Sequence, residues 1–281
     1  ALQRLKSYRK HPLSAILFLL VVISAVITLT VLIALIAYIL IKGIPNLSPE
    51  LFEWEYTTEN VSMMPAIINT LIITALSLLF ALPVGICSAI YLVEYAKRGN
   101  KLVSIVRITT ETLSGIPSIV YGLFGYLFFN IFLEWSYTIL GGALTLAIMI
   151  LPLIMRTTEE ALIAVPDLYR EGSFGLGAGK LRTVFRIVLP SAVPGILAGV
   201  ILAVGRIVGE TAALLYPAGT ATTVADGLMS SGRTLAVHMY ALLNEGLYMD
   251  QAYATAVVLL VVVIGINALS GLIAKKVGVK D

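Results

Sequence analysis

The stretch LPSAVPGILAGVILAVGRIVGETAALL, residues 189–215, places an arginine and a glutamate four positions apart in an otherwise apolar run. A helix needs about 20 apolar residues to cross the hydrocarbon core of a membrane. Residues 191–205 carry no charge, and the run continues past Arg206 and Glu210 to residue 219. We therefore expect one membrane helix over 191–219, with both charges inside it.

An arginine at the centre of such a helix costs about 2.5–3.5 kcal/mol on insertion scales, so it needs a partner or a cavity. At about 100° per residue, both charges share one broad helix face with two pairs of glycines at the spacing that permits close helix contact. The glycines are Gly195, Gly199, Gly205 and Gly209. The charges should face the protein interior, where Arg206 either forms a structural ion pair with Glu210 or offers its donors to an anion that crosses the membrane.

The composition of the whole chain agrees with a membrane protein. Of its 281 residues, 59% are hydrophobic and only 12% are charged, against about 25% charged residues in ordinary globular domains. The other long apolar runs cover 12–41, 65–93, 116–133, 137–155 and 252–274. These runs do not alternate between apolar and polar positions, which excludes a transmembrane barrel. The sequence predicts an all-α membrane protein with six transmembrane helices.

Lysine and arginine predict the orientation of these helices. They gather before the first predicted span and after the second, fourth and sixth, whereas the other connections hold only Lys42 and Arg233 among several acidic residues. Cytoplasmic loops carry the excess of basic residues, so both termini should be cytoplasmic. With a net charge of +3, this asymmetry reports topology and not binding of nucleic acid.

The connections also differ in length and character. The long cytoplasmic loop 156–190 mixes apolar and charged residues, which favours short amphipathic helices that dock on the bundle or on another protein. Residues 234–247 of the long outer loop fit a short interfacial helix. Gly115 and Pro117 would interrupt the third span just after Glu111. This segment is either a bend beside a translocation path or a cytoplasmic elbow that leads into the span.

The sequence carries no catalytic motif. GLGAGK at 175–180 is only partly similar to a phosphate-binding loop, because Phe174 stands where glycine is needed and Leu181 where Ser or Thr must bind magnesium. The spacing of His, Cys and carboxylates also fits no metal site. We therefore predict no ATPase activity, catalytic residue, metal or cofactor in this chain.

The cytoplasmic loop resembles the EAA loop of the membrane subunits of ABC importers. In REGSFGLGAGKLRTVFRIVLP, residues 170–190, an E-x-x triplet is followed by a glycine and then by I-x-L-P at that family's spacing. Glycine and serine replace the two alanines of the motif, which weakens the helix by roughly 0.5–1 kcal/mol at the glycine. The matching residues, to which the resemblance assigns coupling to an ATPase, are Glu171, Gly172, Ser173, Gly177, Ile187, Leu189 and Pro190.

Several other stretches resemble one branch of that family, the PstA-like membrane subunit of the high-affinity phosphate importer. They include ETLSGIPSIVYGLFG at 111–125, EEALIAVPDLYREGS at 159–173 and TLAVHMY at 234–240. The resemblance implies a type I ABC importer permease fold and a phosphate path that includes Arg206, Glu210 and Thr211, with Arg170 near its cytoplasmic side.

The same resemblance implies partners. They are a second homologous permease subunit, two copies of an ATP-binding subunit that holds ATP and Mg²⁺, and an extracytoplasmic phosphate-binding protein, all at the inner membrane of a prokaryote. Residues 1–60 would form the cytoplasmic N-terminus, first helix and outer loop, and residues 61–281 the permease core. A permease for another oxyanion, such as molybdate, tungstate or sulfate, is the alternative, because a guanidinium and a carboxylate do not by themselves select phosphate.

Overall fold

The computed structural model describes residues 12–97 and 99–278, without the side chains of residues 12, 15 and 273–278. The basic segment 1–11, which entered the prediction of orientation, lies outside the described residues. All regular structure in the described part is helical. The α-helices are α2 (Pro12–Gly43), α3 (Met64–Ile90), α4 (Lys101–Ser114), α5 (Ser118–Gly125), α6 (Ile139–Ile163), α7 (Asp167–Gly175), α8 (Lys180–Thr183), α9 (Leu189–Val208), α10 (Leu235–Glu245) and α11 (Met249–Gly278).

Five short segments extend or connect these helices. Two are 3₁₀ turns, η1 (Ile44–Asn46) and η2 (Pro49–Phe52). Three are π-helical turns, η3 (Tyr91–Tyr95), η4 (Tyr126–Phe132) and η5 (Val184–Val188). The prediction of an all-α chain is confirmed.

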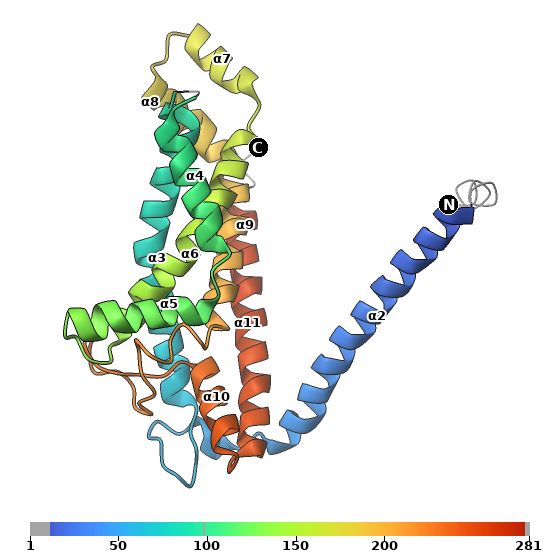
Figure 1. Ribbon diagram of the computed structural model, residues 1–281, viewed down its shortest axis with the longest axis vertical. Coiled ribbons are helices and arrows are strands. Elements are labelled where there is room, and N and C mark those ends of the chain that lie inside the picture. Colours follow the sequence, from blue (N-terminus) through green and yellow to red (C-terminus); the bar gives the residue numbers. More distant parts are fainter. Residues whose placement is uncertain (1–11, 98, 279–281) are drawn as a thin grey trace.

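The number of spans depends on one bent segment. Five helices of the described part are long and apolar enough to cross a membrane, and a sixth span results only if α4 and α5 with η4 count as one, because they meet at 103°. Figure 1 shows α4 upright beside α3 and α6, and α5 lying across the bundle. The break falls between Ser114 and Ser118, at the predicted Gly115 and Pro117.

The core forms where α3, α6 and α9 pack together. The central residues of α6, among them Leu146, Met149 and Ile150, are at most 1% exposed. Glycine permits the close approach of α9 to α6, because a Cβ on Gly199 would overlap the side chain of Thr157. This contact confirms the predicted close-packing role of Gly199. By contrast, a Cβ on Gly209 would meet only the carbonyl oxygen of Gly205 on its own helix, at 3.6 Å.

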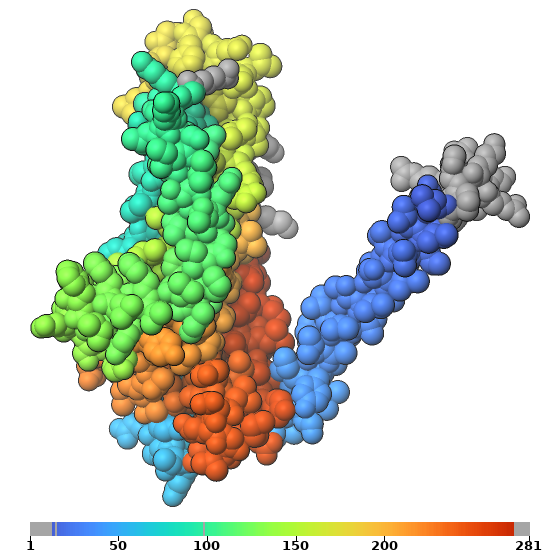
Figure 2. Space-filling view, in the orientation of Figure 1, coloured from blue at the N-terminus to red at the C-terminus, as the bar shows by residue number. Residues whose placement is uncertain are grey.

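Helix α2 stands away from the bundle. None of its most apolar 18-residue window is buried, and the C-terminal end of the helix meets α11 (Figures 1 and 2). There the hydroxyls of Tyr38 and Tyr253 lie 3.2 Å apart, and Gly43 packs tightly against the backbone of Tyr253.

The bundle has two ends. Helices α7 and α8 lie at one, which we call the α7 end, and α10 lies at the other, the α10 end (Figure 1). Helix α10 confirms the short helix predicted over 234–247. Thr234 caps its first turn by accepting a hydrogen bond from the Val237 backbone, and Gly246 ends it in the left-handed conformation at φ 71°.

Two predicted helix boundaries were wrong. The helix expected over 191–219 ends at Val208, because Gly209, a residue of low helix propensity, caps it and the chain then turns. The span expected to end at 155 continues as α6 to Ile163. Arg156 and Glu160 form an ion pair one turn apart at 3.0 Å, and Leu162 is fully buried. Charged residues on one side and apolar residues on the other thus extend the helix beyond the apolar run.

Candidate anion pocket and coupling end

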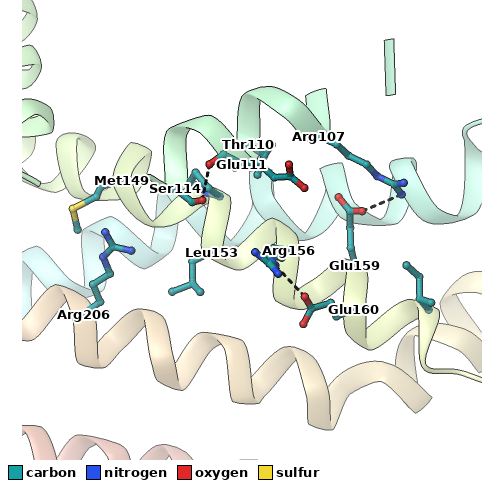
Figure 3. A pocket seen from close by; sticks show the side chains of 12 residues that line it. Arg107, Thr110, Glu111, Ser114, Met149, Leu153, Arg156, Glu159, Glu160 and Arg206 are labelled. Carbon is teal, nitrogen blue, oxygen red and sulfur yellow. Dashed lines mark hydrogen bonds and ion pairs between the residues drawn. The ribbon is translucent and has the colours of Figure 1, made fainter. Parts of the chain in front are cut away.

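A cavity of about 390 Å³ lies between α4, α6 and α9 (Figure 3). Eight of its twelve lining residues are charged or polar, although two of these helices are long and apolar enough to span a membrane. Polar residues at membrane depth are tolerated where they face protein or a water-filled space. The lining residues are Arg107, Thr110, Glu111, Ser114, Met149, Pro152, Leu153, Arg156, Glu159, Glu160, Ile163 and Arg206.

Arg206 enters this cavity from the last turn of α9. Figure 3 shows it rising from α9 beside Met149 and Leu153. A cation is favoured at this position, because the free carbonyl groups give the C-terminus of a helix a partial negative charge. The sequence required a partner or a cavity for this arginine, and in the structure Arg206 lines a cavity.

Glu210 and Thr211 lie outside the helix that was predicted to contain them. The Glu210 carboxylate accepts a hydrogen bond from the Ala213 backbone at 3.2 Å, and the Thr211 carbonyl accepts from Leu214 at 3.1 Å and from Leu215 at 3.2 Å. Together they stabilise the turn that follows α9. The alternative of a structural pair has no support, since no ion pair within residues 12–97 and 99–278 joins Arg206 to Glu210.

Two ion pairs lie in the cavity wall. Arg107 of α4 lies 3.1 Å from Glu159 of α6, and Arg156 lies 3.0 Å from Glu160, one turn further along α6. Sequence reasoning assigned no site role to these four residues, because it placed the end of the span before Arg156. The signal that could have revealed part of this set is the four-residue spacing of Arg156 and Glu160, which indicates an ion pair on a helix that continues past residue 155.

A second hollow, of about 710 Å³, adjoins the cavity and shares Arg107, Glu111 and Ile163 with it. Its lining includes Lys97, on the connection between η3 and α4, and Lys101, the first residue of α4. Through these shared residues the two hollows together form a surface that reaches from Arg206 to the start of α4. Lysine and arginine at its outer part give this surface a positive field that favours anions.

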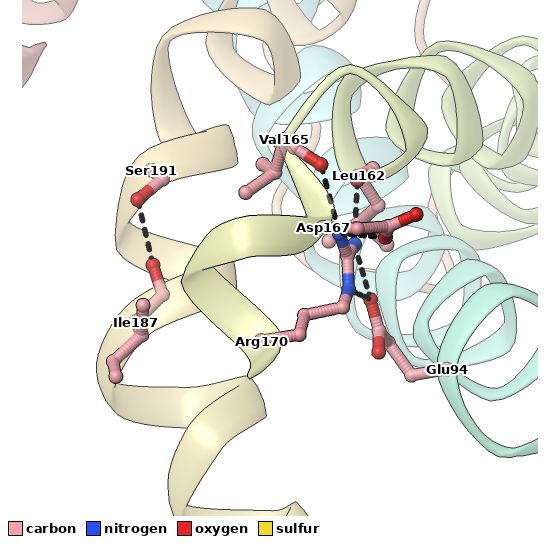
Figure 4. A network of polar contacts seen from close by, with 7 residues as sticks. All are labelled: Glu94, Leu162, Val165, Asp167, Arg170, Ile187 and Ser191. Atoms are coloured by element: carbon pink, nitrogen blue, oxygen red, sulfur yellow. Dashed lines mark hydrogen bonds and ion pairs between the residues drawn. The ribbon is translucent and has the colours of Figure 1, made fainter. Parts of the chain in front are cut away.

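Arg170 of α7 lies apart from the cavity and forms a clamp (Figure 4). Its guanidinium donates to the Glu94 carboxylate at 2.7 and 3.1 Å, to Asp167 at 3.1 Å, and to the carbonyls of Leu162 and Val165 at 2.9 and 2.8 Å. These five bonds match the five N–H donors of arginine. Sequence reasoning missed Glu94, which η3 supplies, and the bonds fix α7 to the ends of α3 and α6.

The EAA-spaced residues divide by exposure. Glu171 and Gly172 are exposed on α7, whereas Ser173 is buried and its hydroxyl lies 2.8 Å from that of Thr183. Gly177 turns the chain at φ 82°. Of the last three, Ile187 lies in η5, and Leu189 and Pro190 begin α9. Here Ser191 donates to the Ile187 carbonyl at 2.7 Å (Figure 4).

Large apolar side chains remain exposed around this segment. Leu176 is 92% exposed and Leu168 75%. A Cβ built on Gly172 or Gly177 would meet no atom within 4 Å. The predicted amphipathic helix is therefore present as α7, and its outer surface contacts nothing in the described chain.

Comparison with known proteins places this architecture among transporters. The sequence matches the family described as "Binding-protein-dependent transport system inner membrane component" over residues 81–279. It is 35% identical to the probable ABC transporter permease protein YqgI of Bacillus subtilis, over 81% of this chain and 82% of that protein. It is also 34% identical to the phosphate transport system permease protein PstA of Haemophilus influenzae, over 77% of each chain, and 33% identical to PstA 1 of Mycobacterium tuberculosis, over 74% of this chain and 69% of that protein.

Solved structures share the fold at lower sequence identity. A bacterial alginate ABC transporter in complex with an alginate-bound periplasmic protein aligns with a TM-score of 0.72, at 16% identity, over 97% of this chain and 98% of its own. An inward-facing methionine ABC transporter, MetNI, aligns with a TM-score of 0.63, at 22% identity, over 75% and 94%.

Proposed function

The chain belongs to the family of inner membrane components of binding-protein-dependent transport systems, and on that premise we propose that it is the translocation subunit of an ATP-driven importer of inorganic phosphate. The predicted type I ABC importer permease fold is confirmed by the solved transporters that share it. The observation that carries the substrate is the Arg206 guanidinium in a cavity between α4, α6 and α9, together with relatives that are named for phosphate transport.

Arginine suits this task because its planar donors match the oxygens of an oxyanion. Arg206 would attract phosphate at membrane depth without holding it tightly, since release into the cytoplasm must follow. The adjoining hollow with Lys97 and Lys101 would then conduct the anion away from Arg206. The relatives named for phosphate favour this substrate over molybdate, tungstate or sulfate.

The α7 end would bind a separate ATP-binding subunit, two copies of which would serve this chain and a second homologous permease. ATP and Mg²⁺ would be held by that subunit, and this chain would have no ATPase site of its own. Support comes from the exposed apolar residues of α7 and from the five-bond clamp at Arg170, which would pass movements of α7 to α3 and α6. The α7 end and both termini would then be cytoplasmic, and the phosphate-binding protein would dock at the α10 end.

The test is anion-dependent ATPase activity of the complete complex, reconstituted with its binding protein. We expect phosphate to stimulate the activity and sulfate and molybdate not to. Arg206→Gln should abolish phosphate uptake without loss of assembly, and Arg206→Lys should retain part of it, because lysine keeps the charge but loses the planar donors. Stimulation by another anion would overturn phosphate as the substrate. Loss of assembly in Arg206→Gln would show that this residue has a structural role.

A further inference from the structure

The charged residues of the cavity do not all pair with one another. The wall carries three arginines and three glutamates. Two glutamates are held by ion pairs, Glu159 with Arg107 at 3.1 Å and Glu160 with Arg156 at 3.0 Å. Among the described ion pairs none includes Arg206 or Glu111. One guanidinium and one carboxylate therefore remain available in the same cavity.

Glu111 is positioned by the interruption of the third span. It lies in the last turn of α4, and the 103° bend to α5 follows at once. The Ser114 hydroxyl donates to the Glu111 backbone carbonyl at 2.7 Å, and the Thr110 hydroxyl donates to Val106 at 2.8 Å. Both neighbouring hydroxyls are thus directed to the backbone, and the Glu111 side chain lines the cavity wall between them (Figure 3). This placement supports the bend beside a cavity over the simple elbow.

The cavity has room for a tetrahedral oxyanion together with water. Its volume of about 390 Å³ is roughly ten times the share of one water molecule in the liquid, about 30 Å³. An anion that moves along the cavity from Arg206 toward Arg107 would pass Glu111, because all three residues line this space (Figure 3). A carboxylate repels an anion unless the anion brings a proton that the carboxylate can accept.

We propose that Glu111 is the residue by which this permease selects a protonated oxyanion. In this assignment, which rests on the proposed function, Arg206 attracts the charged oxygens of phosphate, and Glu111 accepts a hydrogen bond from the hydroxyl group of the anion as it passes along the cavity. Phosphate keeps at least one proton at neutral pH, whereas sulfate, of the same shape, has none. Sulfate has no hydroxyl that could donate a hydrogen bond to Glu111. Its negative charge would therefore be repelled by the Glu111 carboxylate, and this repulsion would select against sulfate.

Glu111 is the carboxylate for this role because the other two are already engaged. Arg107 neutralises Glu159, whose side chain is only 14% exposed. Glu160 is 65% exposed and paired along its own helix.

The experiment measures weak anion binding to the whole complex with the binding protein left out, so that the permease alone sets the selectivity. The probe is inorganic phosphate, followed by broadening of its ³¹P resonance, and sulfate is the competitor. For the wild type we expect the sulfate concentration that removes half of the broadening to exceed the half-saturating phosphate concentration at least about tenfold, since hydrogen bonds to charged groups differ by that order between a matched and a mismatched ligand. Glu111→Gln should reduce this ratio to about twofold.

Two further variants make the outcome interpretable. Glu111→Asp keeps the carboxylate and should retain most of the selectivity, and Glu59→Gln makes the same chemical change at an exposed residue away from the cavity. An unchanged phosphate-to-sulfate ratio in Glu111→Gln would overturn the assignment even if phosphate binds. If the wild type binds no phosphate, or binds sulfate equally well, the failure lies in the proposed substrate.

Discussion

The α10 end of the bundle buries its polar side chains, whereas the α7 end leaves apolar side chains exposed. Asn69 of α3 is fully buried and bonds to the loop between α9 and α10. Its side-chain nitrogen donates to the Thr223 carbonyl at 3.0 Å, and its oxygen accepts from the Ala225 backbone at 3.1 Å. At the opposite end Leu176 is 92% exposed. At the α10 end this buried amide is bonded within the chain, and at the α7 end the exposed apolar side chains leave a surface that a partner could cover.

The contacts of the buried arginine side chains also differ between the two ends. At the α10 end Arg233 is only 4% exposed and its guanidinium lies over the ring of Tyr56, 4.9 Å from the centroid. His238 packs edge-on against the same ring. At the α7 end Arg170 meets Glu94, and all its donors are bonded. The arginine at the α10 end thus contacts an aromatic ring, whereas the arginine at the α7 end forms an ion pair and hydrogen bonds that join helices.

The largest effect is expected at the clamp. Arg170→Ala should lower the free energy of unfolding by about 3–5 kcal/mol, because it leaves Glu94, 7% exposed, as an uncompensated charge. Thermal unfolding of the purified complex measures the loss. Backbone hydrogen exchange should become faster in α7 and stay unchanged in α10. The control is Arg156→Ala, which breaks a pair of two mostly exposed side chains and should cost at most about 1 kcal/mol. Equal costs for the two variants would contradict the clamp.

A smaller, pH-dependent effect is expected at the α10 end. Burial, together with the nearby Arg233, lowers the pKa of His238 to about 3. The unfolded chain binds a proton near pH 6.5 and the folded chain does not, so stability present above that pH is lost as pH falls toward the folded pKa. Between pH 7.5 and 5 the wild type should lose about 1–2 kcal/mol from this group. His238→Gln should remove that part of the pH dependence, which unfolding at the two pH values measures.

The control for His238→Gln is Arg156→Ala, because Arg156 does not contact the α10 end. This control should lose as much free energy of unfolding between pH 7.5 and 5 as the wild type does. A loss of the same size in His238→Gln and wild type would mean that His238 is protonated in the folded chain.

The smallest effect on stability is expected at the exposed apolar surface. Leu176→Asp should change the free energy of unfolding by less than about 0.5 kcal/mol, yet prevent co-purification of the ATP-binding subunit. Leu247→Asp is the matched variant at the α10 end, where Leu247 is 80% exposed, and it should leave co-purification intact. If both variants or neither lose the ATP-binding subunit, the contrast between the two ends would not extend to partner binding.

The helices themselves were largely readable from the sequence. Runs of apolar residues, the breaker pair Gly115 and Pro117, and the cap residues around α10 act through local propensity and burial, which neighbouring residues decide. The mixture of apolar and charged residues in 156–190 predicted a short amphipathic helix, and α7 lies there. Boundaries at charged residues were missed in both directions, with α6 running on to Ile163 and α9 stopping at Val208.

The candidate site depended on tertiary structure. Sequence alone placed Arg206 on a protein-facing side of its helix, but its nearest charged neighbour in the chain, Glu210, turned to cap a loop. Arg107, Glu111 and Glu159 reach one cavity because α4 and α6 pack side by side. Glu94 meets Arg170 across 76 positions of the chain. Which charges pair and which remain available is decided by helix packing, because ion pairs need contact within a few ångströms, and sequence spacing fixes such contacts only within one helix.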